Sequence, residues 1–455
     1  MPIQDTIAAI ATPPGTGGMA VLRISGPDAF DIAGRVFKPS AGRMVCEMPG
    51  YTAAYGHILE GDSPIDDGVL TAFRAPHSYT GEHTCEISCH GGDYLANRIL
   101  TALITAGARP ALPGEFTKRA FLGGKMDLTR AESVIELIEA EGEQALRLAH
   151  MAREGHTEQL VDAVTDRLVD MAAALAAYAD YPDEDLGETD PAELAISLSR
   201  EMAALDALTA GYEAGQIVRR GVQTAIVGRP NVGKSSLMNR LFGRRRSIVT
   251  DLPGTTRDVV EAEAMIGGLR FILADTAGLR ETGDAVEQLG VELSYERMAG
   301  ADLVLCVIDA SEPLSDKDCA LVSGLAGRRA IVVLNKTDRP AQVATADVPG
   351  FGGAVIALSA ETGEGFDALS SAMIKACDLP GAADSMLIAN RRQLDCALLS
   401  RAALEEAHAA LTGGVTLDAV ATLLDEAIAP LLELTGRRVN ETVIDALFAK
   451  FCVGK

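Results

Sequence analysis

The chain has 455 residues, of which 48% are hydrophobic and 23% charged, a composition typical of a globular protein with about three domains. Its 40 Lys and Arg against 64 Asp and Glu give a formal net charge of −24, which argues against strong nucleic-acid binding by the chain's own charge. It has no run of about 18 uncharged apolar residues and no basic signal region at its N-terminus, so we expect a cytoplasmic protein with no membrane segment.

Residues 1–119 combine short β-like runs, such as 20–24, with Gly- and Pro-containing turns and a helical stretch near 94–106. This mixture predicts an N-terminal α+β domain. Two of the eight cysteines, Cys85 and Cys89, have a spacing that superficially resembles a metal-binding pair. Because that spacing also suits a strand, and no second Cys/His pair completes four ligands, we favour the strand. The scattered cysteines suit a reducing compartment.

Helical spacing of apolar residues runs through 120–216 and returns in 381–455. In the second stretch Val420 and Leu424 lie on one helix face, and Pro430 is expected to kink that helix. The two stretches predict the first and second parts of one all-α helical domain.

Between them, residues 217–380 alternate apolar runs such as "QTAIVG" and "DLVLCVIDAS" with amphipathic stretches. That alternation predicts a parallel sheet with crossover helices. We therefore expect an α/β domain inserted into the helical domain.

The sequence "GRPNVGKSS" (228–236) follows an apolar strand and leads into an amphipathic helix, as a phosphate-binding loop does. Lys234 is expected to reach the β- and γ-phosphates of a nucleotide, and Ser235 to bind Mg²⁺. A later "NKTD" (335–338) follows another apolar run and identifies the base. The Asp338 carboxylate can accept hydrogen bonds from guanine N1–H and its exocyclic amine, a pair that adenine does not offer. The order and spacing of these motifs predict GTP.

The rest of "NKTD" and two further segments complete the predicted nucleotide site. Asn335 is expected to brace the phosphate loop, Lys336 to cover the base, and the Ala360 N–H, in the turn 358–363, to meet guanine O6. The "DTAG" segment 275–278 ends a strand and is expected to sense the γ-phosphate. The inserted domain is thus predicted to be a P-loop GTPase (G) domain. Its predicted GTP-binding residues are Asn231, Val232, Gly233, Lys234, Ser235, Ser236, Thr250, Asp251, Leu252, Pro253, Gly254, Thr255, Thr256, Asp275, Thr276, Ala277, Gly278, Asn335, Lys336, Asp338, Ser359, Ala360 and Glu361.

The sequence departs from the familiar small GTPases at the position after "DTAG". A Gln usually stands there and orients the attacking water, whereas Leu279 cannot do so. The charge that an arginine finger usually supplies must also come from elsewhere. A monovalent cation held by the Asn231 side chain and backbone carbonyls of 250–255 would supply it.

The phosphate loop with Asn231, "DLPGTTRD", "DTAGLRET", "NKTD" and the terminal "FCVGK" resemble the family of tRNA modification GTPases known as MnmE or TrmE. "TPPGTGGMAVLRISG", "SYTGEHTCEISCHGG" and "PGEFTKRAFLGGKMDLTRAE" extend the resemblance over residues 3–455. It implies a K⁺-activated GTPase that, with a flavoprotein partner, carries out 5-carboxymethylaminomethyl-type modification of the wobble uridine of certain tRNAs, using a tetrahydrofolate one-carbon unit.

The resemblance also implies roles for particular residues in hydrolysis. It places a water-orienting role on Glu287, which from the residues alone would be a solvated surface charge, and it implies dimerisation of the G domains across the nucleotide. The implied catalytic residues are Glu287, Asn231, Thr256 and Gly278. The implied metal ligands are Ser235 and Thr256 for Mg²⁺, and Asn231, Thr250, Leu252 and Thr255 for K⁺.

In the N-terminal domain the resemblance implies dimerisation and the binding of a tetrahydrofolate derivative, 5-formyl or 5,10-methylene. The matching positions are Arg23, Glu86, Lys125 and Lys455. Glu86 suits the pterin amide edge, and the three cations suit a glutamate tail. Cys452 has two interpretations: a nucleophilic thiol, or packing near the folate pocket, which we favour.

The implied partners are GTP, a second copy of the chain, an MnmG-like flavoprotein that carries FAD and completes a heterotetramer, and tRNA, mostly through that basic partner. An alternative is a regulatory switch of the Era or EngA type that binds ribosomal RNA and performs no modification.

Overall fold

The structure is a computed structural model that describes residues 5–180, 190–243, 261–275, 298–348, 350–377 and 387–454. By its internal packing the chain divides into two compact units. Unit 1 comprises Met1–Ile135, Arg153–Ala195 and Ala402–Lys455, and unit 2 comprises Glu136–Ala152 and Ile196–Arg401. The predicted domain boundaries after residues 119, 216 and 380 remain predictions.

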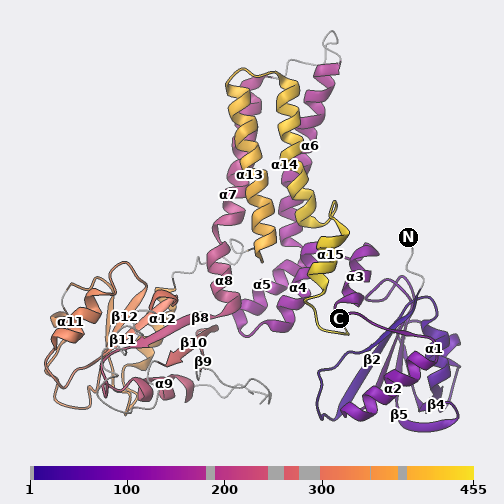
Figure 1. Ribbon diagram of the computed structural model, residues 1–455, viewed down its shortest axis with the longest axis horizontal. Helices are drawn as coiled ribbons and strands as arrows, with labels where there is room; N and C mark the ends of the chain where they lie inside the picture. Colours follow the sequence, from indigo (N-terminus) through magenta and orange to yellow (C-terminus); the bar gives the residue numbers. More distant parts are fainter. Residues whose placement is uncertain are drawn as a thin grey trace. The chain divides into compact units, whose positions relative to one another are not determined.

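Unit 1 contains a seven-stranded sheet in the order β3-β4-β5-β6-β2-β1-β7 (Figure 1). All its pairings are antiparallel except that of β1 with β7. Two helices pack on the sheet and share its apolar core. The elements are β1 Ile7–Ile10, β2 Met19–Ser25, α1 Ala29–Val36, β3 Phe37–Pro39, η1 Val45–Glu47, β4 Thr52–Glu60, β5 Ser63–Phe73, β6 Thr84–His90, α2 Asp93–Thr105 and β7 Arg109–Pro110.

The two cysteines with the metal-like spacing lie in β6, as predicted, and both are buried. Burial raises the pKa of the Cys85 thiol to about 12 and that of Cys89 to about 11. Within the described residues neither belongs to a group of possible metal ligands. They are therefore protonated core residues of the strand.

In unit 1, helices from the two predicted helical stretches, 120–216 and 381–455, pack against each other. α6 and α14 run side by side (Figure 1), and the apolar positions Val420 and Leu424 of α14 are fully buried. Pro430 lies inside α14. The C-terminal helix α15 packs on α3 and the start of α4 through aromatic residues. The bounds are α3 Glu115–Leu122, α4 Leu128–Glu139, α6 His156–Asp180, α14 Leu417–Thr435 and α15 Glu441–Phe448.

Unit 2 contains a six-stranded sheet in the order β13-β12-β11-β8-β10-β9, parallel except for β9. Every residue of β11 and β12 is buried, because separate apolar clusters cover the two faces of the sheet. The elements are β8 Val222–Val227, α9 Lys234–Gly243, β9 Glu261–Ile266, β10 Leu269–Asp275, β11 Leu303–Asp309, α11 Asp316–Ser323, β12 Ala330–Asn335, η2 Thr345–Asp347, β13 Ala354–Ala357 and α12 Phe366–Ala376.

Four further helices lie within the described residues. They are α5 Glu143–Glu154, α7 Pro191–Ala210, α8 Tyr212–Arg220 and α13 Arg391–Thr412. Among the described segments, none combines the length and apolar character that a bilayer crossing requires. The α+β sheet, the long helices and the mostly parallel α/β sheet between them confirm the predicted fold class.

Candidate functional site

The phosphate loop lies between the end of β8 at Val227 and the start of α9 at Lys234. Gly233 has φ +99°, and a Cβ there would lie 2.2 Å from Asn335 Nδ2. Gly228 is equally constrained, since a Cβ would lie 2.3 Å from the Val307 carbonyl oxygen. The loop therefore requires glycine at both positions, because the backbone passes too close to β11 and β12 for a side chain.

Asn335, the last residue of β12, joins the phosphate loop to the turn at 359–361. Its side chain is buried; Nδ2 donates to the Val232 carbonyl at 2.8 Å and Oδ1 accepts from Ala360 N at 2.9 Å. We call this arrangement the Asn335 clamp. The Ala360 N–H that we expected at guanine O6 is engaged with Asn335 here, so its contact with a base stays a prediction.

Asp338 is held as a charged carboxylate by a hydrogen bond from the turn at 359–361. Its Oδ1 accepts a 2.5 Å hydrogen bond from Ser359 Oγ, and Ser359 Oγ also accepts from Thr362 N at 3.1 Å. The hydrogen bond from Ser359 holds the pKa of the Asp338 carboxyl below its usual range. The carboxylate is thus charged at neutral pH and can accept from two N–H groups.

Two lysines lie against the phosphate loop. Lys234 Nζ donates to the Gly228 and Arg229 carbonyls at 2.8 and 2.7 Å. Lys336 Nζ donates to the Asn231 carbonyl at 2.8 Å and to Asp309 Oδ2 at 2.5 Å. The two ammonium groups therefore hold three backbone carbonyls of the loop.

Two charged residues, one beside the loop and one within it, were missed by the sequence reasoning. Asp309 ends β11 next to Asn335 of β12, and Arg229 Nε donates to the buried Asp318 at 2.9 Å. The signal for Asp309 was available, since a carboxylate that ends the apolar run "LVLCVID" lies at the same sheet edge as "NKTD".

The other predicted residues of this site are divided by what the structure describes. Ser235 and Ser236 are exposed in the first turn of α9, and Glu361 is exposed with its carbonyl 3.4 Å from Arg240 Nη1. Asp275 ends β10. Outside the described residues lie Thr250, Asp251, Leu252, Pro253, Gly254, Thr255, Thr256, Thr276, Ala277, Gly278 and Glu287.

A second candidate site surrounds Arg23 of β2 in unit 1. Its Nε pairs with Glu86 Oε1 at 2.8 Å, and its Nη1 lies 3.4 Å from the Gly454 carbonyl oxygen. The guanidinium carbon lies 5.4 Å from the Tyr79 ring centre and 5.6 Å from that of Phe116. We call these five residues the Arg23 site, a half-buried charge pair beside the C-terminal tail.

The other residues predicted for this domain are Lys125, Lys455 and Cys452. Lys125 Nζ donates to the Pro76 carbonyl at 3.1 Å, and Lys455 is outside the described residues. The Cys452 side chain is exposed, while its carbonyl accepts from Gly114 N at 3.3 Å. The backbone of the tail is thus docked, and the thiol's role stays open between chemistry and packing.

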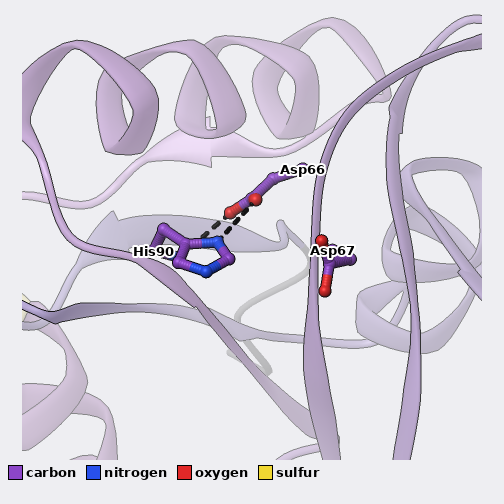
Figure 2. A group of neighbouring side chains, drawn as sticks. All are labelled: Asp66, Asp67 and His90. Carbon is purple, nitrogen blue, oxygen red and sulfur yellow. Dashed lines mark hydrogen bonds and ion pairs between the residues drawn. The ribbon is translucent and has the colours of Figure 1, made fainter.

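Figure 2 shows a separate polar group on the N-terminal sheet, formed by Asp66, Asp67 and His90. His90 Nδ1 lies 2.8 Å from Asp66 Oδ1, and Asp67 Oδ2 accepts from Tyr55 Oη at 2.6 Å. The hydrogen bond and negative charge of Asp66 raise the pKa of His90. Cross-strand pairing accounts for these contacts, and we assign no metal to the group.

Comparisons with known proteins extend these observations. A family model described as "GTP-binding protein TrmE N-terminus" matches residues 6–125, and one described as "MnmE helical domain" matches residues 128–452. A relative from Symbiobacterium thermophilum named "tRNA modification GTPase MnmE" is 41% identical over 99% of this chain and 100% of its own. One of the same name from Geotalea uraniireducens is 40% identical over 100% of both chains. The solved structure of Aquifex aeolicus Era bound to GDP and AlF4⁻ is 28% identical over 40% of this chain and 66% of its own, with a TM-score of 0.27.

Proposed function

Since the chain belongs to the MnmE family of tRNA modification GTPases, we propose that it binds and hydrolyses GTP and takes part in modifying tRNA. The observation that best supports the GTP step is the Asn335 clamp, which joins the phosphate loop to the turn beside the charged Asp338. A nucleotide between them would meet phosphate donors at one end and a guanine acceptor at the other.

The hydrolysis we propose depends on Mg²⁺ and K⁺. The exposed Ser235 hydroxyl, in the first turn of α9, is an oxygen ligand of the kind Mg²⁺ prefers, and Thr256 would be the second. Asn231 is exposed with φ +63° and carries a side-chain carbonyl, the ligand type that replaces water around K⁺. Its partners would be Thr250, Leu252 and Thr255. These donor sets fit the two ions, and K⁺ would neutralise charge that develops on the phosphates.

Because Leu279 offers no polar group, the attacking water would be oriented by Glu287. Thr256 and the Gly278 N–H would contact the γ-phosphate. Glu287→Ala should then retain GTP affinity and lower the turnover number about tenfold or more. Single-turnover hydrolysis beside nucleotide titration measures both quantities, and an unchanged turnover number would remove Glu287 from the mechanism.

In unit 1 we propose that the Arg23 site binds a tetrahydrofolate derivative, 5-formyl or 5,10-methylene. Arg23 and Lys125, with Lys455, are cations of the type that bind a glutamate tail, and Glu86 is an acceptor for a pterin amide edge. The partly exposed Tyr79 ring beside Arg23 provides an apolar surface for a flat ligand, and the fully buried Phe116 ring packs on Arg23 from the core. When bound, such a group supplies a one-carbon unit.

We further propose that the chain acts in the cytoplasm as a homodimer. Its partner would be an MnmG-like flavoprotein carrying FAD, in a heterotetramer that installs a 5-carboxymethylaminomethyl-type group on the wobble uridine. The net charge of −24 favours a basic partner as the main tRNA-binding surface. Calorimetric titration of 5-formyl-tetrahydrofolate into the full chain distinguishes the proposed modification enzyme from the alternative, a regulatory GTP switch. Binding near one folate per chain supports the modification enzyme, whereas no binding by a chain that hydrolyses GTP favours the switch.

A further inference from the structure

The ammonium of Lys336 lies where it can hold two segments of unit 2 together. It reaches the Asn231 carbonyl of the phosphate loop and the carboxylate of Asp309 at the end of β11. Lys336 itself has φ +68°, a left-handed backbone that costs free energy for a residue with a side chain. A conformation of that kind persists only where surrounding contacts determine it, and the two hydrogen bonds of Nζ are such contacts.

Asp309 is a buried carboxylate whose two oxygens have different partners. Oδ1 accepts from Ser311 N at 2.9 Å and from Ser311 Oγ at 2.7 Å, and so it stabilises the turn after β11. Oδ2 accepts from Lys336 Nζ. Its side chain is 4% exposed. Burial opposes the charge of Asp309, but the hydrogen bonds from Lys336 and Ser311 outweigh it and lower its pKa. The hydrogen bonds of the turn therefore explain only one oxygen of Asp309, and the charge on the other is matched by Lys336.

Burial makes this ion pair different from the exposed pairs elsewhere in unit 2. A buried carboxylate that loses its cation keeps the cost of its desolvation, so the pair is held more tightly than an exposed one. Asp302, at the amino end of β11, accepts instead from the exposed Arg220 Nη2 at 2.7 Å. Asp302, directly before β11, is thus an acidic residue for comparison at the edge of the sheet opposite to the nucleotide loops.

We propose that Asp309 is a positioning residue for guanine-nucleotide binding, which fixes Lys336 against the Asn231 carbonyl and so couples the base-covering lysine to the phosphate loop. The inference rests on the proposed function, because it requires a guanine nucleotide between these two segments. Asp309 makes no contact with the base or phosphates in this scheme, and it acts only through Lys336.

A double-mutant cycle tests that route of action. Fluorescently labelled GDP is titrated into the full-length wild type, Asp309→Asn, Lys336→Met and the double variant. Each single substitution should weaken GDP binding about tenfold, the range for a hydrogen bond to a charged group. The double variant should bind no more weakly than Lys336→Met, because Asp309 has then lost the group through which it acts. Losses that multiply would overturn the proposal.

Asp302→Asn is the matched control, and its GDP affinity should stay within about twofold of wild type. If Asp309→Asn does not fold, Ser311→Ala replaces it in the cycle, since the hydroxyl orients the same carboxylate. It should weaken binding about threefold in wild type and not at all beside Lys336→Met; equal losses in both backgrounds would contradict the proposal. A wild type that binds no GDP would overturn the proposed function itself. Normal wild-type binding with unchanged affinity in Asp309→Asn would overturn only the positioning role.

Discussion

The two candidate sites of this protein are held in different ways. In unit 2 the nucleotide loops are joined by buried hydrogen bonds from Asn335, at the end of a strand buried on both faces. In unit 1 the Arg23 site is a half-buried charge pair beside two aromatic rings and in contact with the C-terminal tail. The first site should therefore fail when its backbone is displaced, and the second when its tail is released.

The largest effect is expected at the base-recognition residue of unit 2. Asp338→Asn replaces a carboxylate that accepts two N–H groups by an amide that repels one of them. GDP affinity should fall about a hundredfold or more, since two hydrogen bonds to a charged group are lost. Xanthosine diphosphate, which offers a carbonyl in place of the amine, should bind Asp338→Asn better than wild type does. Competition titrations measure both, and a variant that still prefers GDP would break the assignment.

The backbone requirement of the clamp is tested by Gly233→Ala. The new Cβ would lie 2.2 Å from Asn335 Nδ2 at a φ of +99°, so the phosphate loop must move away from Asn335. We expect GDP affinity to fall about thirtyfold, through loss of the clamp and of loop geometry. Gly300→Ala is the control, because a Cβ there meets nothing within 4 Å. Equal GDP affinity in the two variants would show that the clamp is dispensable.

Release of the tail should affect only the site in unit 1. Gly454 has φ +95°, and a Cβ there would lie 2.5 Å from the Ile10 carbonyl oxygen. Gly454→Ala should displace the tail from Arg23 and weaken 5-formyl-tetrahydrofolate binding about fivefold, leaving GDP affinity unchanged. Gly18→Ala, where a Cβ meets nothing within 4 Å, is the calorimetric control. Unchanged folate binding in Gly454→Ala would separate the tail from the Arg23 site.

The smallest effect concerns the pair formed by the exposed His90 and the less exposed Asp66. The pKa of His90 is raised from 6.5, so its contribution to stability is complete below that pH and is lost as pH rises through the raised value. The pKa of Asp66 is lowered from 3.8, despite the opposing effect of burial, so its contribution is lost as pH falls through the lowered value. His90→Gln should therefore lower the urea midpoint at pH 5 more than at pH 8.5. An equal loss at both pH values would show that the pair contributes no charge interaction.

The residues proposed for the unit 2 site could be grouped from the sequence because they lie in short motifs at the ends of apolar strands. Parallel strands bring their carboxyl ends to one edge, so Asn231, Asn335 and Asp338 could be grouped without coordinates. Asp309 lies at the same edge, but a single Asp after an apolar run belongs to no motif. The contacts of Lys336 with Asp309 and Asn231 depend on the tertiary structure and cannot be read from the sequence.

The site in unit 1 was less accessible to prediction from the residues. Arg23, Glu86 and Gly454 are separated along the chain by strands, helices and the whole of unit 2, and no local spacing relates them. The resemblance to a family proposed Arg23 and Glu86. Their ion pair across β2 and β6, the two aromatic neighbours and the contact with the tail are consequences of packing.

The measurement that tests the central claim most directly is phosphate release from GTP by the full chain, in KCl and in NaCl at matched ionic strength, with excess ATP as competitor. We predict hydrolysis about tenfold or more faster in KCl, as expected for a cation in place of an arginine finger, and no inhibition by ATP. Equal rates in the two salts would contradict the proposed role of Asn231 and K⁺, and inhibition by ATP would contradict guanine recognition by Asp338.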